Sequence, residues 1–246
     1  MARLVARLAV LCAGIAAMSA HSASADDMQR IGTFSIDRTE VTIADFGAFV
    51  AATGTVTRAE RDGGGSVYEA GWVRKPGWTW KTPFGQPGNP REPAVHVTWD
   101  EAAAYCRWAG KRLPTDAEWV EAAYTERRND PPAPFRSGRT YPWPTGDSPA
   151  GANCLQDCGP QTAALDRSAQ LTRGIGPAPA GTTARGVNGL FDMGANVWEW
   201  VDGTLGSERI TRGGSWWYGA PQMKQDHRVG KPPDTAVVYI GFRCAR

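Results

Sequence analysis

One stretch, residues 190–217, restricts the fold of this 246-residue chain more than any other. Two carboxylates, Asp192 and Glu199, flank the turn Gly194-Ala195-Asn196. Glycine and asparagine permit left-handed backbone angles, so main-chain carbonyls can turn toward a point that the carboxylates also face. The stretch has the pattern of neither a plain helix nor a plain strand. It indicates either a hard-cation site, with calcium as the expected ion, or a tight turn whose acids are solvated.

The N-terminus has the pattern of a secretory signal peptide. Arg3 and Arg7 precede an apolar run over residues 8–18, and the small residues Ala23-Ser24-Ala25 follow. The run is too short to span a bilayer. We therefore expect residues 1–25 to be removed, the mature chain to be periplasmic or secreted, and residues 26–246 to form one domain.

The mature chain gives no electrostatic reason to bind nucleic acid or an anionic membrane. Removal of residues 1–25 removes two arginines and no acids, so the formal charge falls from +2 to 0. A near-neutral protein lacks the basic surface that phosphate-rich partners attract. We expect a monomer without a membrane span.

The composition predicts a loop-rich but well-packed domain. The sequence has 29 Gly and 18 Pro, which favour turns over regular elements. It also has 11 Trp, and each buried indole fixes the irregular backbone around it. After signal removal four cysteines remain, an even number that predicts two disulfides in an exported chain: Cys106, Cys154, Cys158 and Cys244. A zinc site is the competing interpretation, but only one pair is closely spaced.

Local patterns predict a small number of regular elements. Three helices are expected after the capping residues Thr42, Thr98 and Thr115. Strands are expected around residues 34–36 and at residues 94–97, 208–212 and 237–244. Loops are expected over residues 55–91, 127–149 and 151–189.

Four sequence blocks then carry a resemblance to a known family. They are residues 34–42 (FSIDRTEVT), residues 97–119, the pair NVWEW at 196–200 and RGGSW at 212–216, and GFRCA at 241–245. In this order the blocks resemble the formylglycine-generating enzyme family, also called the sulfatase-modifying factor family. The resemblance implies a single α+β domain of C-type-lectin-like character with little regular secondary structure.

The resemblance also implies metal ligands and a disulfide pairing. Family members bind calcium at positions that correspond here to the side chains of Asp192 and Glu199 and the carbonyls of Ala195 and Val197. A second calcium site would map onto Asn153, the Cys154 carbonyl, Asp166 and the Ser168 carbonyl. Cys106 and Cys244 match a family disulfide, which leaves Cys154 and Cys158 as a local bridge.

The catalytic cysteines of the family are absent. Its catalysts oxidise a substrate cysteine to formylglycine with two copper-binding cysteines, and Tyr218 and Met223 occupy those positions here. Neither can supply a thiolate, so we expect neither copper nor formylglycine formation. Sulfoxide synthases of the family use three histidines at iron, whereas the mature chain has only His96 and His227. Whether this chain binds iron stays open, and we interpret His96 as a core residue.

Two functions remain. The first is a maturation factor, resembling the family's oxidoreductases, that modifies a peptide-like substrate, with His227, Arg228 and Tyr218 as candidate catalytic residues. Its groove would be bordered by Trp216, Trp217, Tyr218, His227, Arg228 and Arg243. The second is a non-catalytic module that binds a peptide, protein or glycan, in which calcium only stabilises the loops.

Overall fold

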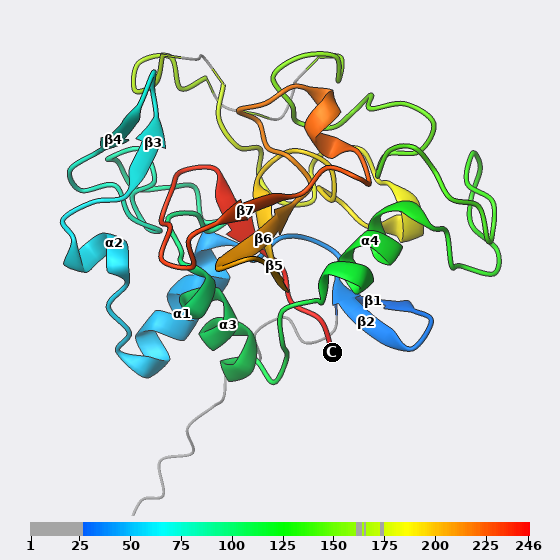
Figure 1. The fold of residues 1–246 in the computed structure, drawn as a ribbon, viewed down its shortest axis with the longest axis horizontal. Helices are drawn as coiled ribbons and strands as arrows, with labels where there is room; N and C mark the ends of the chain where they lie inside the picture. The colour runs from blue at the N-terminus through cyan, green and yellow to red at the C-terminus, as the bar shows by residue number, and fades with distance from the viewer. Residues whose placement is uncertain (1–26, 161–163, 165, 173–174) are drawn as a thin grey trace, which may run out of the picture.

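The computed structural model describes residues 27–160, 164, 166–172 and 175–246, so the predicted signal peptide lies outside the described residues. Loops make up most of the described chain and surround a few short helices and strands (Figure 1). This confirms the expected loop-rich α+β domain. In the described part of the chain, no helix has both the length and the apolar character that crossing a bilayer requires.

The helices begin where threonine caps predict them. These are α1 (Ile43–Thr53), α3 (Trp99–Trp108) and α4 (Asp116–Tyr124). Each cap accepts from the third helical amide, and the acid at that position bonds back to the cap amide: Thr42 with Asp45, Thr98 with Glu101, and Thr115 with Glu118. A fourth box heads the short helix α2 (Arg58–Arg61), inside a segment expected to be loop.

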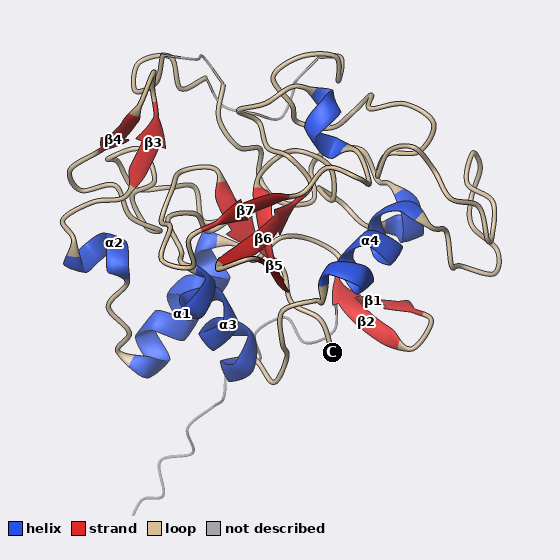
Figure 2. Cartoon of the chain, viewed as in Figure 1, coloured by secondary structure: helices blue, strands red, loops and turns tan. Residues whose placement is uncertain are grey.

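A four-stranded sheet lies at the centre of the molecule, in the order β7-β6-β5-β8 (Figure 2). Its strands are β5 (Trp198–Leu205), β6 (Glu208–Arg212), β7 (Val229–Lys231) and β8 (Ile240–Phe242). β5 pairs antiparallel with β6 and parallel with β8, while β6 pairs antiparallel with β7. Residues 190–217 therefore combine a turn with the two strands β5 and β6.

Two hairpins complete the regular structure. The N-terminal hairpin joins β1 (Met28–Ile31) to β2 (Phe34–Asp37), and the second joins β3 (Ser66–Tyr68) to β4 (Trp72–Arg74). Two single-turn 3-10 helices, η1 (Val187–Gly189) and η2 (Ala220–Met223), lie in the loops. The last residues of the chain run beside β2, where the Ser35 and Arg246 backbones exchange two hydrogen bonds of 2.9 and 2.8 Å.

The strand predicted over residues 94–97 is wrong. The alternation of valine with His96 suggested a strand, but His96 has φ 58° and the chain turns there. The strand predicted over residues 237–244 is shorter than expected, because only β8 pairs with β5. β1, β3, β4, β5 and β7 are strands that the sequence patterns did not predict.

The core has two main parts, one on each face of β5. Because side chains alternate along a strand, Trp198 and Trp200 pack with α1 and α3, whereas Val201 packs with α4 and the β1–β2 hairpin. Glu199 lies between the two tryptophans in sequence and faces the α4 side, where it meets Trp119. The expected disulfides Cys106–Cys244 and Cys154–Cys158 are both present.

Candidate metal centre and binding cavity

The turn before β5 has an unusual backbone. Asp192, Ala195 and Asn196 have φ of 59°, 61° and 50°, a left-handed conformation that few non-glycine residues adopt. Asp192 is 4% exposed, and Glu199 at the start of β5 is 0% exposed. The alternative of a turn with solvated acids is therefore wrong, because both carboxylates lie inside the protein.

Glu199 is held by two donors from other elements. Arg243 binds both of its oxygens at 2.7 Å, through Nη2 to Oε1 and through Nε to Oε2. Trp119 Nε1 donates to Oε2 at 2.8 Å. Since a carboxylate oxygen accepts about two hydrogen bonds, Oε2 is filled and Oε1 keeps one position for another partner.

Asp192 also keeps free acceptor positions. The Gly181 amide donates to its Oδ2 at 2.6 Å, and the Thr183 hydroxyl donates to its Oδ1. Each oxygen therefore keeps about one acceptor position. Burial raises the pKa of the Asp192 carboxyl, its hydrogen bonds lower it, and the charge of Glu199 raises it further.

A third buried carboxylate, Glu40, lies against the same turn. It is 1% exposed and accepts from Asn196 Nδ2 at 2.7 Å and from the Val197 amide at 3.1 Å. Burial raises its pKa well above the ordinary value, and the charges of Asp192 and Glu199 add to that shift. Sequence reasoning missed Glu40, although it lies in the first family block, because its partners are more than 150 residues away.

The charges of this cluster do not balance within the protein. Three buried carboxylates, Glu40, Asp192 and Glu199, share one buried cation, Arg243. When all four groups are ionised, two negative charges remain uncompensated, which is unfavourable away from water. A divalent cation would compensate them, and Asp192 and Glu199 each keep an acceptor position that such an ion could use.

The donor set fits calcium better than a soft metal. Among the described residues, no group of three or more His, Cys, Asp and Glu side chains could hold a metal ion. A cation at the turn would therefore need backbone carbonyls in addition to the two acids, and Ala195 and Val197 were predicted to supply them. Calcium accepts six to eight oxygen ligands of this mixed kind.

The predicted second site is only partly assembled. Asn153 is 3% exposed, its Nδ2 donates to Asn196 Oδ1 at 2.9 Å and to the Gly176 carbonyl at 3.1 Å, and its Oδ1 has no hydrogen-bond partner in the described structure. Cys154 is buried beside it. Asp166 and Ser168 are exposed, and Asp166 accepts from the Ser168 amide at 2.9 Å. Of the two predicted side-chain ligands, Asn153 is thus buried with a free oxygen, whereas Asp166 is exposed.

Three of the residues assigned to the substrate groove belong to the core. Trp216, Trp217 and Arg243 are 0%, 2% and 0% exposed. Arg243 binds Glu199 and donates to the carbonyls of Asp37 and Phe191, so its guanidinium is committed inside the protein. Their assignment to the groove is wrong, since sequence spacing does not show which way a side chain points.

The other groove candidates lie near the surface. Tyr218 and His227 both contact Trp198, with ring centroids at 5.8 and 5.7 Å. Burial lowers the pKa of the His227 imidazole, and Asp226 partly offsets this. Arg228 is exposed, with its Nη1 at 3.7 Å from Asp116. Tyr218 and His227 are therefore brought together, while Arg228 points to the side of α4.

Positions 218 and 223, which were predicted to correspond to the catalytic cysteines of the resembling family, are closely packed. Met223 is fully buried, with its sulfur 3.8 Å from Cys158 Sγ, and the Leu155 amide donates to the Tyr218 carbonyl at 2.9 Å. The loop of the Cys154–Cys158 disulfide thus packs against residues 218–223. All four cysteines of the described chain are in disulfides, so it offers no free thiol.

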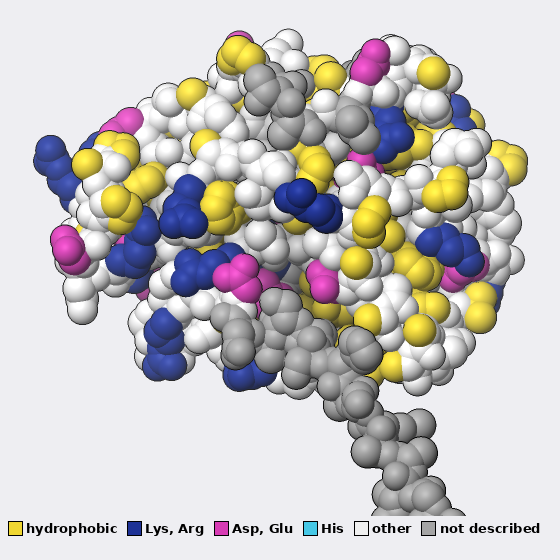
Figure 3. All heavy atoms as spheres, turned by 180° about the vertical axis from the view of Figure 1, so that it is seen from behind, with side chains coloured by type: hydrophobic (Ala, Val, Ile, Leu, Met, Phe, Trp, Pro, Cys, Tyr) yellow, Lys and Arg dark blue, Asp and Glu magenta, His cyan; other side chains and the backbone are white. Residues whose placement is uncertain are grey.

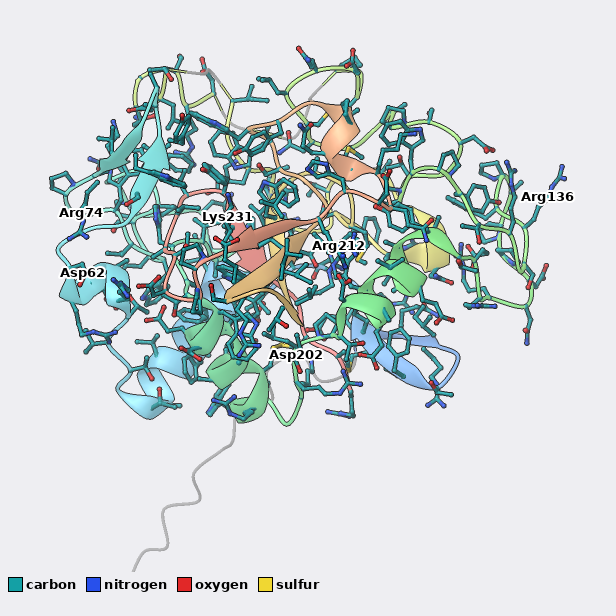
Figure 4. All side chains as sticks on the ribbon, in the orientation of Figure 1. Asp62, Arg74, Arg136, Asp202, Arg212 and Lys231 are labelled. Carbon is teal, nitrogen blue, oxygen red and sulfur yellow. A yellow bond between two sulfur atoms is a disulfide. The ribbon has the colours of Figure 1, made fainter. Side chains whose placement is uncertain are left out.

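A cavity of about 440 Å³ opens among α2, the β3–β4 hairpin and β7, and sequence reasoning missed it. Figure 4 shows Asp62 and Arg74 on the side of α2 and the hairpin, and Lys231 on β7. Acids and bases alternate around the cavity: Arg58 pairs with Asp62 and Asp234, and Arg74 with Asp62. Trp72 adds an indole that is 56% exposed. The lining comes from residues 58–74, 208 and 230–237, so no local pattern could reveal it.

Lys231 is a partly buried cation of this cavity. Burial lowers the pKa of its amine, and the charge of Glu208 partly restores it. Its Nζ lies 6.0 Å from the centre of the Trp72 ring. Together with the ion pairs of Arg58 and Arg74, this makes the cavity a concave site with mixed charge.

On the opposite face of the molecule, basic, acidic and apolar side chains are interspersed without one dominant sign (Figure 3).

Comparisons with known proteins agree with the fold. The family model described as the sulfatase-modifying factor enzyme 1-like domain matches residues 3–246. The chain is 34% identical to the formylglycine-generating enzyme of Streptomyces coelicolor, over 88% of this chain and 79% of that protein. It is 33% identical to the inactive C-alpha-formylglycine-generating enzyme 2 of Mus musculus, over 86% and 74%. The structure of PvdO from Pseudomonas aeruginosa has the same fold, with a TM-score of 0.59 at 21% identity over 87% of this chain and 80% of that one.

Proposed function

Because the chain belongs to the sulfatase-modifying factor family, we propose that it is an exported member that binds a peptide-like segment and does not make formylglycine. The packing at positions 218 and 223 carries this proposal. Met223 fills a buried site against Cys158, and Tyr218 lies between the rings of Trp198 and Tyr239. A thioether and a phenol cannot replace two thiolates as Cu(I) ligands. A relative named as inactive among those that match is consistent with this proposal.

Turnover of a cysteine peptide tests the absence of this chemistry. The mature protein would be incubated with copper, oxygen and a peptide that a formylglycine-generating enzyme converts, and the aldehyde product measured by mass spectrometry. We expect no product, while the Streptomyces coelicolor relative under the same conditions serves as the positive control. Stoichiometric aldehyde formation by this chain would overturn the proposal.

The cavity beside β7 is the site that suits an extended peptide. Its paired charges offer partners to both peptide carbonyls and amides, and Trp72 offers an apolar surface. A peptide array probed with the labelled protein would identify sequences that bind. Trp72→Ala should weaken binding about tenfold, whereas Leu205→Ala, which truncates another exposed apolar side chain, should not. Equal affinity of both variants would remove the cavity from the proposal.

Calcium at the turn before β5 is part of the same proposal. The uncompensated charge of Glu40, Asp192 and Glu199 supports it. Any ligand that binds only the folded state raises stability, so a chelator should lower the melting temperature and added calcium should restore it. Magnesium at the same concentration should restore less, because it demands a smaller octahedral site. An unchanged melting temperature after metal is removed would refute calcium binding.

Catalysis at His227 is the second candidate function. Its ring contacts Trp198, and burial holds the pKa of the imidazole below its ordinary value, so at neutral pH the ring can accept a proton. If a peptide partner is chemically modified, turnover should be lost in His227→Ala and kept in Arg228→Ala. Binding without any modification would leave the non-catalytic function.

A further inference from the structure

A continuous chain of buried hydrogen bonds joins the two predicted cation sites. Asn153 Nδ2 donates to Asn196 Oδ1 at 2.9 Å, and Asn196 Nδ2 donates to Glu40 Oε2 at 2.7 Å. Glu40 Oε1 then accepts from the Val197 amide at 3.1 Å. All three side chains are at most 3% exposed. We call Asn153, Asn196 and Glu40 the amide relay.

The backbone fixes the direction of the amide relay. The Ala178 amide, which can only donate, lies 2.8 Å from one end of the Asn196 side chain, so that end is the oxygen. The other end is then the nitrogen, and it faces Glu40. Asn153 must present its nitrogen to Asn196 Oδ1 and to the Gly176 carbonyl. Its oxygen is therefore left buried without a partner, and the hydrogen-bond pattern itself requires this orientation.

Each end of the relay lies at one predicted site. The buried Asn153 oxygen has no partner and keeps its acceptor positions free for a cation. At the other end, Glu40 holds the Val197 amide and the Asn196 side chain, and so positions the turn whose carbonyls complete the site of Asp192 and Glu199. We propose that these two sites bind divalent cations cooperatively, and that the amide relay couples them. This inference rests on the calcium binding proposed above.

The sign of the coupling follows from the polarity of the amides. A cation at Asn153 Oδ1 draws electron density toward the oxygen and makes the Nδ2 hydrogens better donors. The stronger bond to Asn196 passes the same polarisation to its bond with Glu40. A cation at the turn stabilises the carboxylates there and holds the turn in place, which orders the relay from the other end. Each cation therefore favours the other, and linkage makes the effect equal in both directions.

Calcium titration of the metal-free mature protein tests the proposal. We expect two calcium ions per chain, with the second binding about fivefold or more tighter than independent sites would allow. Glu40→Gln places a donor where Asn196 or Val197 already donates. The variant should therefore still bind two calcium ions, but binding of one ion should no longer change the affinity for the other. Glu126→Gln is the matched control, because Glu126 is also fully buried but bonds to Arg128 and Asn188 instead. This control should keep the cooperativity of the wild type.

The outcomes separate this inference from the proposed function. Two independent ions, or a single ion, in the wild-type protein would overturn the coupling while leaving calcium binding in place. No calcium binding at all would overturn both. Unchanged cooperativity in Glu40→Gln would remove the relay as its cause. If Glu40→Gln does not fold, the wild-type titration still decides whether the sites are coupled.

Discussion

Removal of the Cys106–Cys244 disulfide should destabilise the protein far more than removal of Cys154–Cys158. The first joins residues 138 apart in sequence, and the second joins residues 4 apart. In the chain-entropy model the stabilisation grows with the logarithm of the number of residues in the closed loop. It reaches about 5 kcal/mol for the first bridge and about 2 kcal/mol for the second. For a domain of this size these free energies correspond to decreases of about 10–20 °C and about 4–8 °C in the melting temperature.

Two double variants measure the difference. Cys106→Ala with Cys244→Ala removes the long bridge, and Cys154→Ala with Cys158→Ala removes the short one. Urea unfolding at saturating calcium gives both free energies of unfolding, and the wild type in reductant checks that the effect comes from the bridge. The slope of free energy against urea should rise most in the first variant, since its unfolded state is the more expanded.

A larger effect of the short bridge would refute the reasoning from loop closure. That result would mean that Cys154–Cys158 acts mainly through the folded state, by holding the loop packed on residues 218–223. Similar effects from both bridges would lead to the same conclusion.

Two further predictions concern buried charge. Burial lowers the pKa of His96 to about 4, so the unfolded state takes up a proton first as the pH falls below about 6.5, and this group should lower stability by about 2 kcal/mol between pH 7.5 and pH 5. Urea unfolding at the two pH values should therefore show a change about 2 kcal/mol more unfavourable in the wild type than in His96→Asn, which tolerates the left-handed backbone and keeps every other titrating group. Arg243→Met leaves the buried carboxylates without a cation and should lower the free energy of unfolding by about 3–5 kcal/mol, with partial recovery when Glu199→Gln is added. If Arg243→Met alone were as stable as the wild type, Glu199 would have to take up a proton at little cost in free energy.

Elements that depend on neighbouring residues could be predicted from the sequence. The caps Thr98 and Thr115 were found because each has a glutamate three residues later, and Thr42 because apolar residues at helical spacing follow it. The β3–β4 hairpin was missed, since strands of three residues are too short to show alternation. His96 alternates with valine as a strand residue would, but tertiary packing places it in a turn.

Only the part of the candidate site whose residues lie close together in sequence could be predicted. Asp192 and Glu199 could be paired because they lie on one short stretch with a turn between them. Arg243 was wrongly assigned to a groove. Its ion pair with Glu199 could not be foreseen, because the two residues are 44 apart in sequence and no local pattern links them. Glu40 was missed for the same reason. The cavity beside β7 combines three distant segments, so it becomes visible only in the folded chain.

The pairing of the C-terminal residues with β2 also limits the order in which parts of the fold can form. Arg246 and Cys244 bond to Ser35 and Asp37 at the other end of the chain, and β8 supplies the parallel partner of β5. A ribosome still holding these last residues would hold a chain that lacks Arg243, half of the long disulfide and one edge of the sheet. The β5–β8 pairing and the C-terminal contacts of β2 can therefore form only once these residues are available to the rest of the domain.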